Sequence, residues 1–344
     1  MSVPTPAVAP RAAPVPRAAP MQTALVTGAQ GMLGYWLVQA LLERSCDVVV
    51  LERDENARTA LRIDGLHHRC TCVRGDLLDA PLLTRAIAEH EVDTVFHLAA
   101  QPIAGTAMRS PVSTFETNVR GTWLLLEACR ARGVARTVVA STDRAYGPPR
   151  TLPYTEDMLL DARYPYEVSK AAADLIARSY FHTFGLPVAV TRFSNVYGGG
   201  DLNRSRLVPE LTAAVLAGRA PVIRSDGTPE RDYLYAADAA AAYLAIADAL
   251  GRGPSGGAHG EAFNAGGGEV RSVREVTDLL IEVAGADVVA DIRGAGVPRG
   301  EVDRQFADCT KLRDLTGWAP QVLLRDGLRR TVEWYRAHPE ALAP

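Results

Sequence analysis

A glycine-spaced loop between an apolar strand and an apolar-periodic helix most limits how this chain can fold. The loop is Gly28-Ala29-Gln30-Gly31-Met32-Leu33-Gly34, between a strand at 23–27 and a helix expected to reach about residue 44. Glycines let the backbone approach a pyrophosphate, and a helix N-terminus offers N–H donors at a positive dipole end. Such a loop can also be a plain tight turn, but its strand, spacing and helix together predict a dinucleotide-binding unit.

Apolar strand segments alternate with helical segments through the first 194 residues. The expected strands are 23–27, 47–51, 70–74, 94–98, 136–140 and 188–192, and further helices are expected at 81–89, 112–132 and 166–184. This alternation predicts an α/β fold with a Rossmann-type, doubly wound parallel sheet. Ligands of such sheets bind at the carboxyl ends of the strands, where the motifs described below fall.

The composition excludes several classes of partner. The formal net charge of −3 gives no electrostatic reason to expect nucleic acid or an anionic membrane. No apolar run reaches the roughly 18 residues that a membrane span needs. The five scattered cysteines are expected to be free thiols in a reducing cytoplasm, and the seven histidines show no metal-ligand spacing. We therefore expect a cytoplasmic protein without a metal site.

Tyr166 and Lys170 would lie one turn apart on one face of the helix expected at 166–184. An ammonium group favours the phenolate, so the phenol can accept a proton well below its free pKa near 10. Beside a ribose and a nicotinamide, this pair can take a proton from a sugar hydroxyl while a hydride leaves. The step Ser141-Thr142-Asp143 ends the strand just before this pair in the sequence.

Glu52 ends the second expected strand, about 20 residues after the glycine loop. An acid at this place can bind the hydroxyls of the adenosine ribose, and it would repel a 2′-phosphate. It therefore favours NAD over NADP. Arg53 follows directly, so the alternative is an ordinary solvated Glu-Arg pair at a strand end.

Further motifs give the chain a resemblance to a known family from Thr23 to about Glu333. They are Gly75-Asp76-Leu77, His97-Leu98-Ala99-Ala100, Asn118 with Gly121-Thr122, Ser141-Thr142, Tyr166-x-x-x-Lys170, Arg192-x-x-Asn195-x-Tyr197-Gly198 and Arg231-Asp232-Tyr233. With the glycine loop, they resemble the extended short-chain dehydrogenase/reductases that act on nucleotide sugars. Ala99-Ala100-Gln101-Pro102 and residues 141–147 look most like the sugar-nucleotide 4,6-dehydratases, especially the CDP-glucose type.

The resemblance implies an NAD-dependent 4,6-dehydratase and gives its catalytic residues their roles. Tyr166 would remove the proton of the C4 hydroxyl, and Thr142 would position the same oxygen. Lys170 would hold the nicotinamide ribose and lower the pKa of Tyr166. Asp143 would protonate the departing C6 hydroxyl after C4 oxidation. The alternative for Asp143 is a carboxylate that caps a turn.

Arg144 departs from the pattern of the dehydratases. The dTDP-glucose type places Asp then Glu after the threonine and the CDP-glucose type resembles Asp then Lys, whereas this chain has Asp143 then Arg144. Arginine cannot act as a base at accessible pH. Another group must then remove the C5 proton, while Arg144 stabilises an enolate or binds an anionic substituent. Otherwise the chain is an epimerase or another oxidoreductase on this scaffold.

A third possible function is that of a catalytically silent NAD-sensing protein. The intact Thr142, Tyr166 and Lys170 argue against it, because such a protein does not need all three.

The resemblance also implies contacts to a tightly bound NAD and to a nucleotide sugar. The cofactor residues are Gly28, Gln30, Gly31, Met32, Gly34, Glu52, Arg53, Asp76, Leu77, Leu98, Ala99 and Ala100, with Tyr166 and Lys170. The substrate residues are Asn195, Arg206, Arg224, Arg231 and Arg299. Arg206 and Arg224 have the alternative of being solvated surface arginines.

The expected organisation is a tail, a nucleotide domain and a smaller C-terminal α/β lobe. Residues 1–20 read as a disordered Ala/Pro tail, 21–194 as the NAD-binding domain with 236–262 packing back on it, and 195–235 with 263–344 as the nucleotide-sugar-binding lobe. The resemblance implies a homodimer through the helices at 112–132 and 166–184. Their apolar faces can equally pack on their own sheet.

Overall fold

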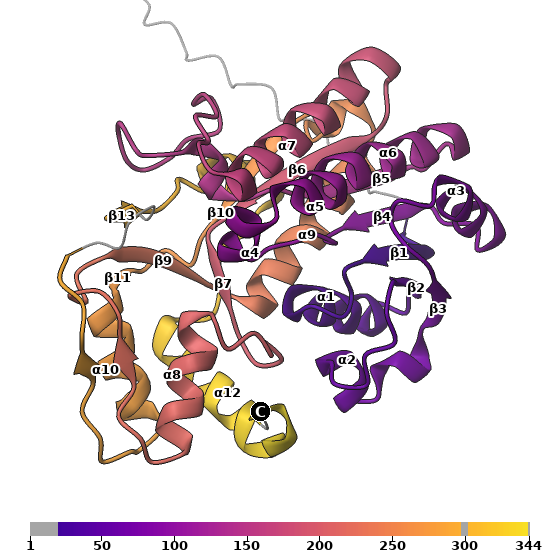
Figure 1. The fold of residues 1–344 in the computed structure, drawn as a ribbon. Coiled ribbons are helices and arrows are strands. Elements are labelled where there is room, and N and C mark those ends of the chain that lie inside the picture. The colour runs from indigo at the N-terminus through magenta and orange to yellow at the C-terminus, as the bar shows by residue number, and fades with distance from the viewer. Residues whose placement is uncertain (1–19, 297–301, 343–344) are drawn as a thin grey trace, which may run out of the picture.

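A seven-stranded parallel sheet forms the centre of the described chain, which is residues 20–296 and 302–342 of a computed structural model (Figure 1). The strands follow the order β10-β6-β5-β4-β1-β2-β3, and every neighbouring pair is parallel. Their bounds are β1 Thr23–Thr27, β2 Asp47–Glu52, β3 Thr71–Arg74, β4 Thr94–His97, β5 Arg136–Ala140, β6 Val188–Phe193 and β10 Ala262–Ala265. The predicted Rossmann-type doubly wound sheet is confirmed. Its strand order reverses between β1 and β4, where such sheets bind ligands.

Helices cover both faces of the sheet because its strands are apolar on both sides. One face packs against α1 (Met32–Glu43), α9 (Ala236–Leu250) and α11 (Thr310–Thr316), and the other against α3 (Ala80–Glu89), α6 (Gly121–Arg132) and α7 (Pro165–Phe184). Along β1, Ala24 and Val26 join the first of these cores and Leu25 joins the second. Side chains alternate between the faces of a strand, so a run of apolar residues builds both cores.

The helix expected at 112–132 is a chain of shorter helical segments. It consists of α5 (Pro111–Phe115), a π-helical turn (Glu116–Arg120) and α6. The remaining short segments on this half are α2 (Ala60–Ile63), α4 (Ala104–Arg109) and the 3₁₀ turns Leu66–Arg69, Asp143–Tyr146 and Pro254–Gly256, with Pro339–Leu342 near the C-terminus. α4 to α7 lie side by side on one outer face (Figure 1).

A smaller sheet with its own apolar core forms the C-terminal lobe. Its strands are β7 (Asn195–Tyr197), β9 (Glu230–Tyr235), β11 (Val270–Ser272) and β13 (Arg304–Gln305), and its core is completed by α8 (Leu207–Leu216), α10 (Val273–Val283) and α12 (Leu324–Ala337). β8 (Val222–Ile223) and β12 (Asp291–Ile292) pair separately. A capping box of Ser272 and Glu275 starts α10 and satisfies its first N–H groups.

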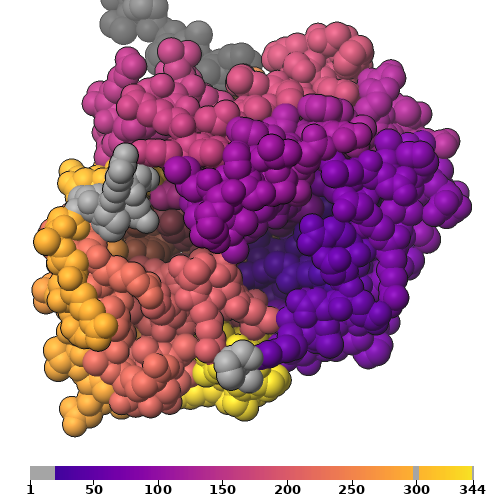
Figure 2. Space-filling view, in the orientation of Figure 1, coloured from indigo at the N-terminus to yellow at the C-terminus, as the bar shows by residue number. Residues whose placement is uncertain are grey.

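The chain passes repeatedly between the two halves of the molecule. It leaves the large sheet after β6, builds β7 to β9, and returns through α9 to add β10 at the edge of that sheet. β10 begins at Ala262 and ends at Ala265, so this strand of the large sheet includes residues 263–265, which were expected to belong to the C-terminal lobe. Figure 2 shows a hollow in the surface between the indigo and purple N-terminal part and the orange C-terminal part.

Residues 1–19, which make up nearly all of the expected tail, lie outside the described residues. In the part of the chain that the structure describes, no helix has the length and apolar character to cross a membrane. The same part holds no group of three or more His, Cys, Asp or Glu side chains arranged to hold a metal ion.

Candidate active site

The glycine loop forms an open cradle between β1 and α1. Gly28 has a φ of 75°, and a Cβ there would lie 2.6 Å from the backbone nitrogen of Ala99. A Cβ on Gly34 would lie 2.2 Å from the carbonyl oxygen of Gly28. Gly31 is exposed and meets nothing closer than 3.4 Å, and no side chain caps the N-terminus of α1. Two glycines thus allow the tight turn, and the third leaves backbone N–H groups accessible to a pyrophosphate.

Glu52 is buried at the carboxyl end of β2 with one oxygen unsatisfied. Its Oε2 accepts a hydrogen bond from Arg62 at 2.9 Å, while its Oε1 is buried without a hydrogen-bond partner among the described residues. Arg53 is exposed and pairs with Asp54 at 2.7 Å, so the solvated Glu52–Arg53 pair does not form. A buried carboxylate oxygen without a donor fits a ribose hydroxyl. Arg62 was not predicted as part of the site, because only the position of α2 brings it to Glu52.

The other expected cofactor residues surround the ends of β1, β3 and β4. Gln30 donates to the carbonyl oxygen of Asp54 at 3.1 Å, and the amide of Ala99 donates to Thr27 Oγ1 at 3.2 Å. Asp76 is exposed just after β3, and its Oδ1 accepts from the amide of Leu78. Met32 and Leu77 are buried, whereas Leu98, Ala99 and Ala100 are partly exposed. The residues present at this edge of the sheet therefore fit a dinucleotide.

Tyr166 and Lys170 begin α7, which starts at Pro165 in the position that favours proline. Lys170 is buried, its Nζ donates to the carbonyl oxygen of Ala140 at 2.8 Å, and burial lowers its pKa to about 8. Burial also raises the pKa of Tyr166, against the positive charges of Arg206 and Arg144 and a hydrogen bond with Thr142. Arg206 and Arg144 thus favour the phenolate. The expected lowering of the Tyr166 pKa by Lys170 stays a prediction.

Thr142 and Asp143 lie at the start of the 3₁₀ turn that follows β5. Thr142 Oγ1 accepts a hydrogen bond from the amide of Arg144 at 3.3 Å, so Thr142 caps the turn. The Asp143 carboxylate does not cap this turn, which was the alternative role given for it above. Thr142 Oγ1 donates to Asp143 Oδ1 at 3.2 Å, and Asp143 Oδ2 is buried with no hydrogen-bond partner in the described ranges.

Burial raises the pKa of Asp143 to about 7. The charges of Arg144 and Arg231 and the Thr142 hydrogen bond act in the opposite direction, and the nearby Asp232 carboxylate adds to the increase. Desolvation of the carboxylate is the largest cause and exceeds the lowering contributions. Asp143 can therefore be a proton donor near neutral pH, and it lies in the same group of residues as Tyr166.

Arg144 faces an open cavity of about 710 Å³. The cavity is also lined by residues 147–152, Arg163, Tyr164, Glu167 and residues 302–305. Within the described residues, the Arg144 guanidinium makes no hydrogen bond or ion pair. Its charge nevertheless lowers the pKa of both Tyr166 and Asp143. A cation at this place can stabilise negative charge that develops on a bound molecule.

The structure describes four of the five expected substrate residues. Arg231 is buried, donates to the carbonyl oxygens of Glu230, Val302 and Asp303, and acts on the pKa of Asp143. Arg206 pairs with Asp201 at 3.0 Å and acts on Tyr166, so the structure brings it to the site.

Of the remaining three substrate residues, two are within the described residues. Arg224 forms an ion pair with Glu210 at 2.6 Å, and its side chain is 70% exposed. It therefore has the character of a solvated surface arginine, which is the alternative given for it above. Asn195 is exposed on β7, opposite Tyr233 of β9. Arg299 lies outside the described residues.

Known proteins that are similar to this chain include nucleotide-sugar dehydratases and epimerases. The model of the NAD dependent epimerase/dehydratase family matches residues 24–266. A dTDP-glucose 4,6-dehydratase of Streptomyces griseus is 36% identical over 327 residues, which cover 91% of this chain and 94% of the relative. A UDP-glucose 4-epimerase of Mycolicibacterium smegmatis is 35% identical over 321 residues, 91% of this chain and 98% of the relative. The solved dTDP-glucose 4,6-dehydratase of Streptomyces venezuelae, with NAD bound, has a TM-score of 0.82 and 32% identity over 93% of this chain and 98% of its own.

Proposed function

The chain belongs to the NAD-dependent epimerase/dehydratase family, and from this membership we propose that it is a nucleotide-sugar 4,6-dehydratase. It would convert an NDP-hexose to an NDP-4-keto-6-deoxyhexose with loss of one water. The observation that carries the proposal is Asp143, a buried carboxyl group beside Tyr166 with one free oxygen and a pKa raised to about 7. Epimerisation at C4 has no leaving group and needs no such acid.

The family is NAD-dependent, and the residues that would hold NAD are the Gly28–Gly34 cradle, Glu52 and Lys170. When bound, NAD supplies the hydride acceptor for C4 and the hydride that returns to C6. Lys170, with a pKa of about 8, is mostly cationic at neutral pH and can donate hydrogen bonds to a ribose.

Five side chains of the protein would carry out the proton transfers and stabilise the charges that develop. Thr142 positions the C4 oxygen, and Tyr166 accepts its proton as a phenolate, which Arg206 and Arg144 favour. Asp143 then gives a proton to the C6 hydroxyl, which leaves as water. Removal of the C5 proton by a group other than Arg144 gives an enolate, which the Arg144 guanidinium stabilises until the C6 hydroxyl leaves and a 4-keto-5,6-ene remains.

A panel of NDP-hexoses tests the proposal. The purified protein is incubated with each sugar, and the products are separated and weighed by mass spectrometry. We expect one nucleotide sugar to lose a single water and to give a 4-keto product that absorbs in strong alkali. Recovery of only an epimer of unchanged mass would reject the dehydratase.

Arg144 supports a second candidate, a nucleotide-sugar epimerase. By the resemblance stated above, it stands where dehydratases of the dTDP-glucose and CDP-glucose types carry Glu or Lys, and the relative from Mycolicibacterium smegmatis is a UDP-glucose 4-epimerase. Deuterium at C5 separates the two reactions. Elimination exchanges that deuterium with solvent, whereas simple C4 epimerisation retains it.

We also propose that the chain is a homodimer that works in the cytoplasm. Large apolar side chains are exposed on α4, α5, α6 and α7, among them Met108, Val112, Trp123, Leu175 and Phe184. Exposed apolar side chains on neighbouring helices support a protein interface, and helices from two copies can pack there. All five cysteines are free, in keeping with a reducing compartment.

A further inference from the structure

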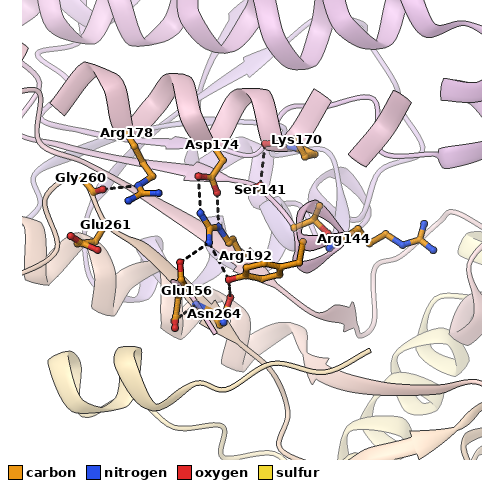
Figure 3. Close-up of polar contacts among 12 residues, drawn as sticks. Ser141, Arg144, Glu156, Lys170, Asp174, Arg178, Arg192, Gly260, Glu261 and Asn264 are labelled. Atoms are coloured by element: carbon orange, nitrogen blue, oxygen red, sulfur yellow. Dashed lines mark hydrogen bonds and ion pairs between the residues drawn. The ribbon is translucent and has the colours of Figure 1, made fainter. Parts of the chain in front are cut away.

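A buried arginine joins the two segments that carry the proposed catalytic groups. α7 carries Tyr166 and Lys170, and the 3₁₀ turn Asp143–Tyr146 carries the proposed acid. Arg192 extends from β6 between them and is only 1% exposed. Asp174, Arg192, Tyr146, Glu156 and Asn264 form the set of contacts that we call the Arg192 network (Figure 3).

On the α7 side, Arg192 binds Asp174 through two parallel hydrogen bonds. Nε donates to Oδ2 at 2.7 Å, and Nη2 donates to Oδ1 at 3.0 Å. Asp174 is fully buried and lies one turn beyond Lys170, on the helix face that also carries Tyr166. The fork geometry fixes the orientation of both groups, which a single point charge cannot do. Arg192 is thereby tied to the helix face that presents Tyr166.

On the other side, Arg192 holds the end of the catalytic turn. Nη1 donates to the Tyr146 hydroxyl at 3.1 Å and to the carbonyl oxygen of Glu156 at 3.2 Å. The guanidinium carbon also lies 5.1 Å from the centre of the Tyr146 ring. Tyr146 in turn donates to Asn264 Oδ1 at 2.7 Å, and its ring stacks on Tyr154. Tyr146 is thus held on several sides, three residues after Asp143.

The network places two charges in the core, although apolar side chains would fill the same space. Burying an ion pair brings little net stability and often less than a hydrophobic pair of equal volume. A fully hydrogen-bonded buried network does, however, select one arrangement of the segments that it connects. Here those segments are α7 and the turn after β5.

We propose that Arg192 is a positioning residue that sets Asp143 and Thr142 at the right distance and angle from Tyr166. Proton removal at C4 and proton donation at C6 require both segments to meet one bound sugar, so a shift of the turn would misplace the second step. This inference rests on the roles proposed above for Tyr166 and Asp143. It adds a residue that touches neither the sugar nor the cofactor.

The test compares Arg192→Lys and Arg192→Met with Arg136→Met. Arg136 is also a buried, ion-paired arginine, but it stands at the amino end of β5, away from the site, and pairs with Asp93 at 3.2 Å. Melting temperature, folded fraction, kcat, KM and the pH dependence of kcat are measured for each. Each rate is divided by the amount of folded protein, and it is measured on whichever product the wild type makes. The variants can therefore be compared with the wild type even if that product is an epimer.

We expect both arginine-to-methionine variants to lose thermal stability, and only the Arg192 variants to lose turnover. Arg192→Lys keeps the charge but not the fork, and a misplacement of about 1 Å can lower kcat by roughly 100-fold. KM should stay within about three-fold, and the alkaline limb of the pH profile should move because the surroundings of Asp143 change. Arg136→Met should keep the wild-type kcat and pH profile.

Tyr146→Phe provides a milder variant that keeps the stacked ring. It removes only the hydroxyl that links Arg192 to Asn264. We expect near-normal folding, a reduced kcat and a shifted pH limb. If Tyr146→Phe and Arg192→Lys fold and keep the wild-type kcat and pH profile, or if Arg136→Met changes both quantities as much as Arg192→Met does, the positioning role is overturned.

Discussion

Asp143 links the stability of the protein to pH. Its folded pKa of about 7 lies above the ordinary aspartate value of 3.8, so folding favours the protonated form. The contribution to stability is therefore full below pH 4 and is lost as the pH rises to about 7, a change of about 4 kcal/mol for a shift of roughly three units. Asp143→Asn removes this dependence.

Thermal unfolding of both proteins between pH 5 and 8 tests this prediction. The advantage of Asp143→Asn over the wild type should grow up to about pH 7 and then level off. Asparagine can still accept the hydrogen bond from Thr142, so the local geometry is kept. Parallel melting curves at every pH would contradict a raised pKa.

Tyr166→Phe and Asp143→Asn should stop the reaction at different points. The first variant lacks the group that accepts the C4 proton, so both nicotinamide reduction and product formation should fall by about 10²–10⁴-fold. The second should still reduce nicotinamide in the presence of substrate, while loss of water falls by a similar factor. Rapid-mixing absorbance and product mass measure the two steps. Normal nicotinamide reduction in Tyr166→Phe would remove Tyr166 from its proposed role.

Among the structural elements, the loop that opens α1 offers a matched pair of substitutions. Gly34→Ala should prevent the native turn, because its Cβ would lie 2.2 Å from the carbonyl oxygen of Gly28. Gly31→Ala meets nothing closer than 3.4 Å and should fold normally. The new methyl group would stand between the helix N-terminus and the cofactor, so we expect at least a ten-fold weaker affinity for NAD, or about 1.4 kcal/mol. Melting curves test the folding of both variants, and titration with NAD tests the affinity of Gly31→Ala. An unchanged NAD affinity in Gly31→Ala would contradict a role of this loop in binding the pyrophosphate.

The outer face of α7 tests the proposed dimer. Leu175 is 57% exposed there, and Leu175→Glu would place a charge in any interface that covers it. We expect the variant to be a monomer with a normal far-ultraviolet spectrum when light scattering measures its mass. Val289→Glu is the control, because Val289 is also exposed but lies in the C-terminal lobe. A wild-type monomer, or equal behaviour of both variants, would contradict the proposal.

The large elements were predictable because buried parallel strands are continuous apolar runs flanked by periodic helices. β10 was not predicted: it is four residues long and contains Asn264, whose amide is satisfied by Tyr146 and Tyr154 from distant parts of the chain. The motif residues around Tyr166 follow from the sequence. The electrostatics do not, since Arg206 and Arg144 reach Tyr166 only through the packing of separate elements.

At the scale of the whole molecule, residues 198–201 form a seam between the two halves. Gly199 accepts a hydrogen bond from Trp36 of α1, and its Cβ position lies 2.4 Å from the Trp334 ring of α12. A Cβ on Gly200 would lie 2.9 Å from the Cβ of Ala60 and 3.0 Å from the Tyr35 ring. The nucleotide half and the C-terminal lobe are therefore packed through backbone that only glycine allows.

Gly199→Ala should weaken this seam. Overpacking of this kind costs about 1–3 kcal/mol, so we expect a lower melting temperature in calorimetry. Gly199→Ala with Trp334→Leu should recover part of the loss, because the smaller side chain makes room for the methyl group. If the single variant melts like the wild type, or if the double variant shows simple additivity, the seam is not tight.

The late arrival of β10 has a consequence for synthesis on the ribosome. β6 ends at Phe193 and its edge partner begins at Ala262, so residues 194–261 must be translated before that edge is covered. At roughly 5–20 residues per second, a nascent chain exposes a bare hydrogen-bonding edge for about 3–14 seconds. During that interval a neighbouring polypeptide can pair with it, which makes this stretch of translation the period when the chain most needs a chaperone.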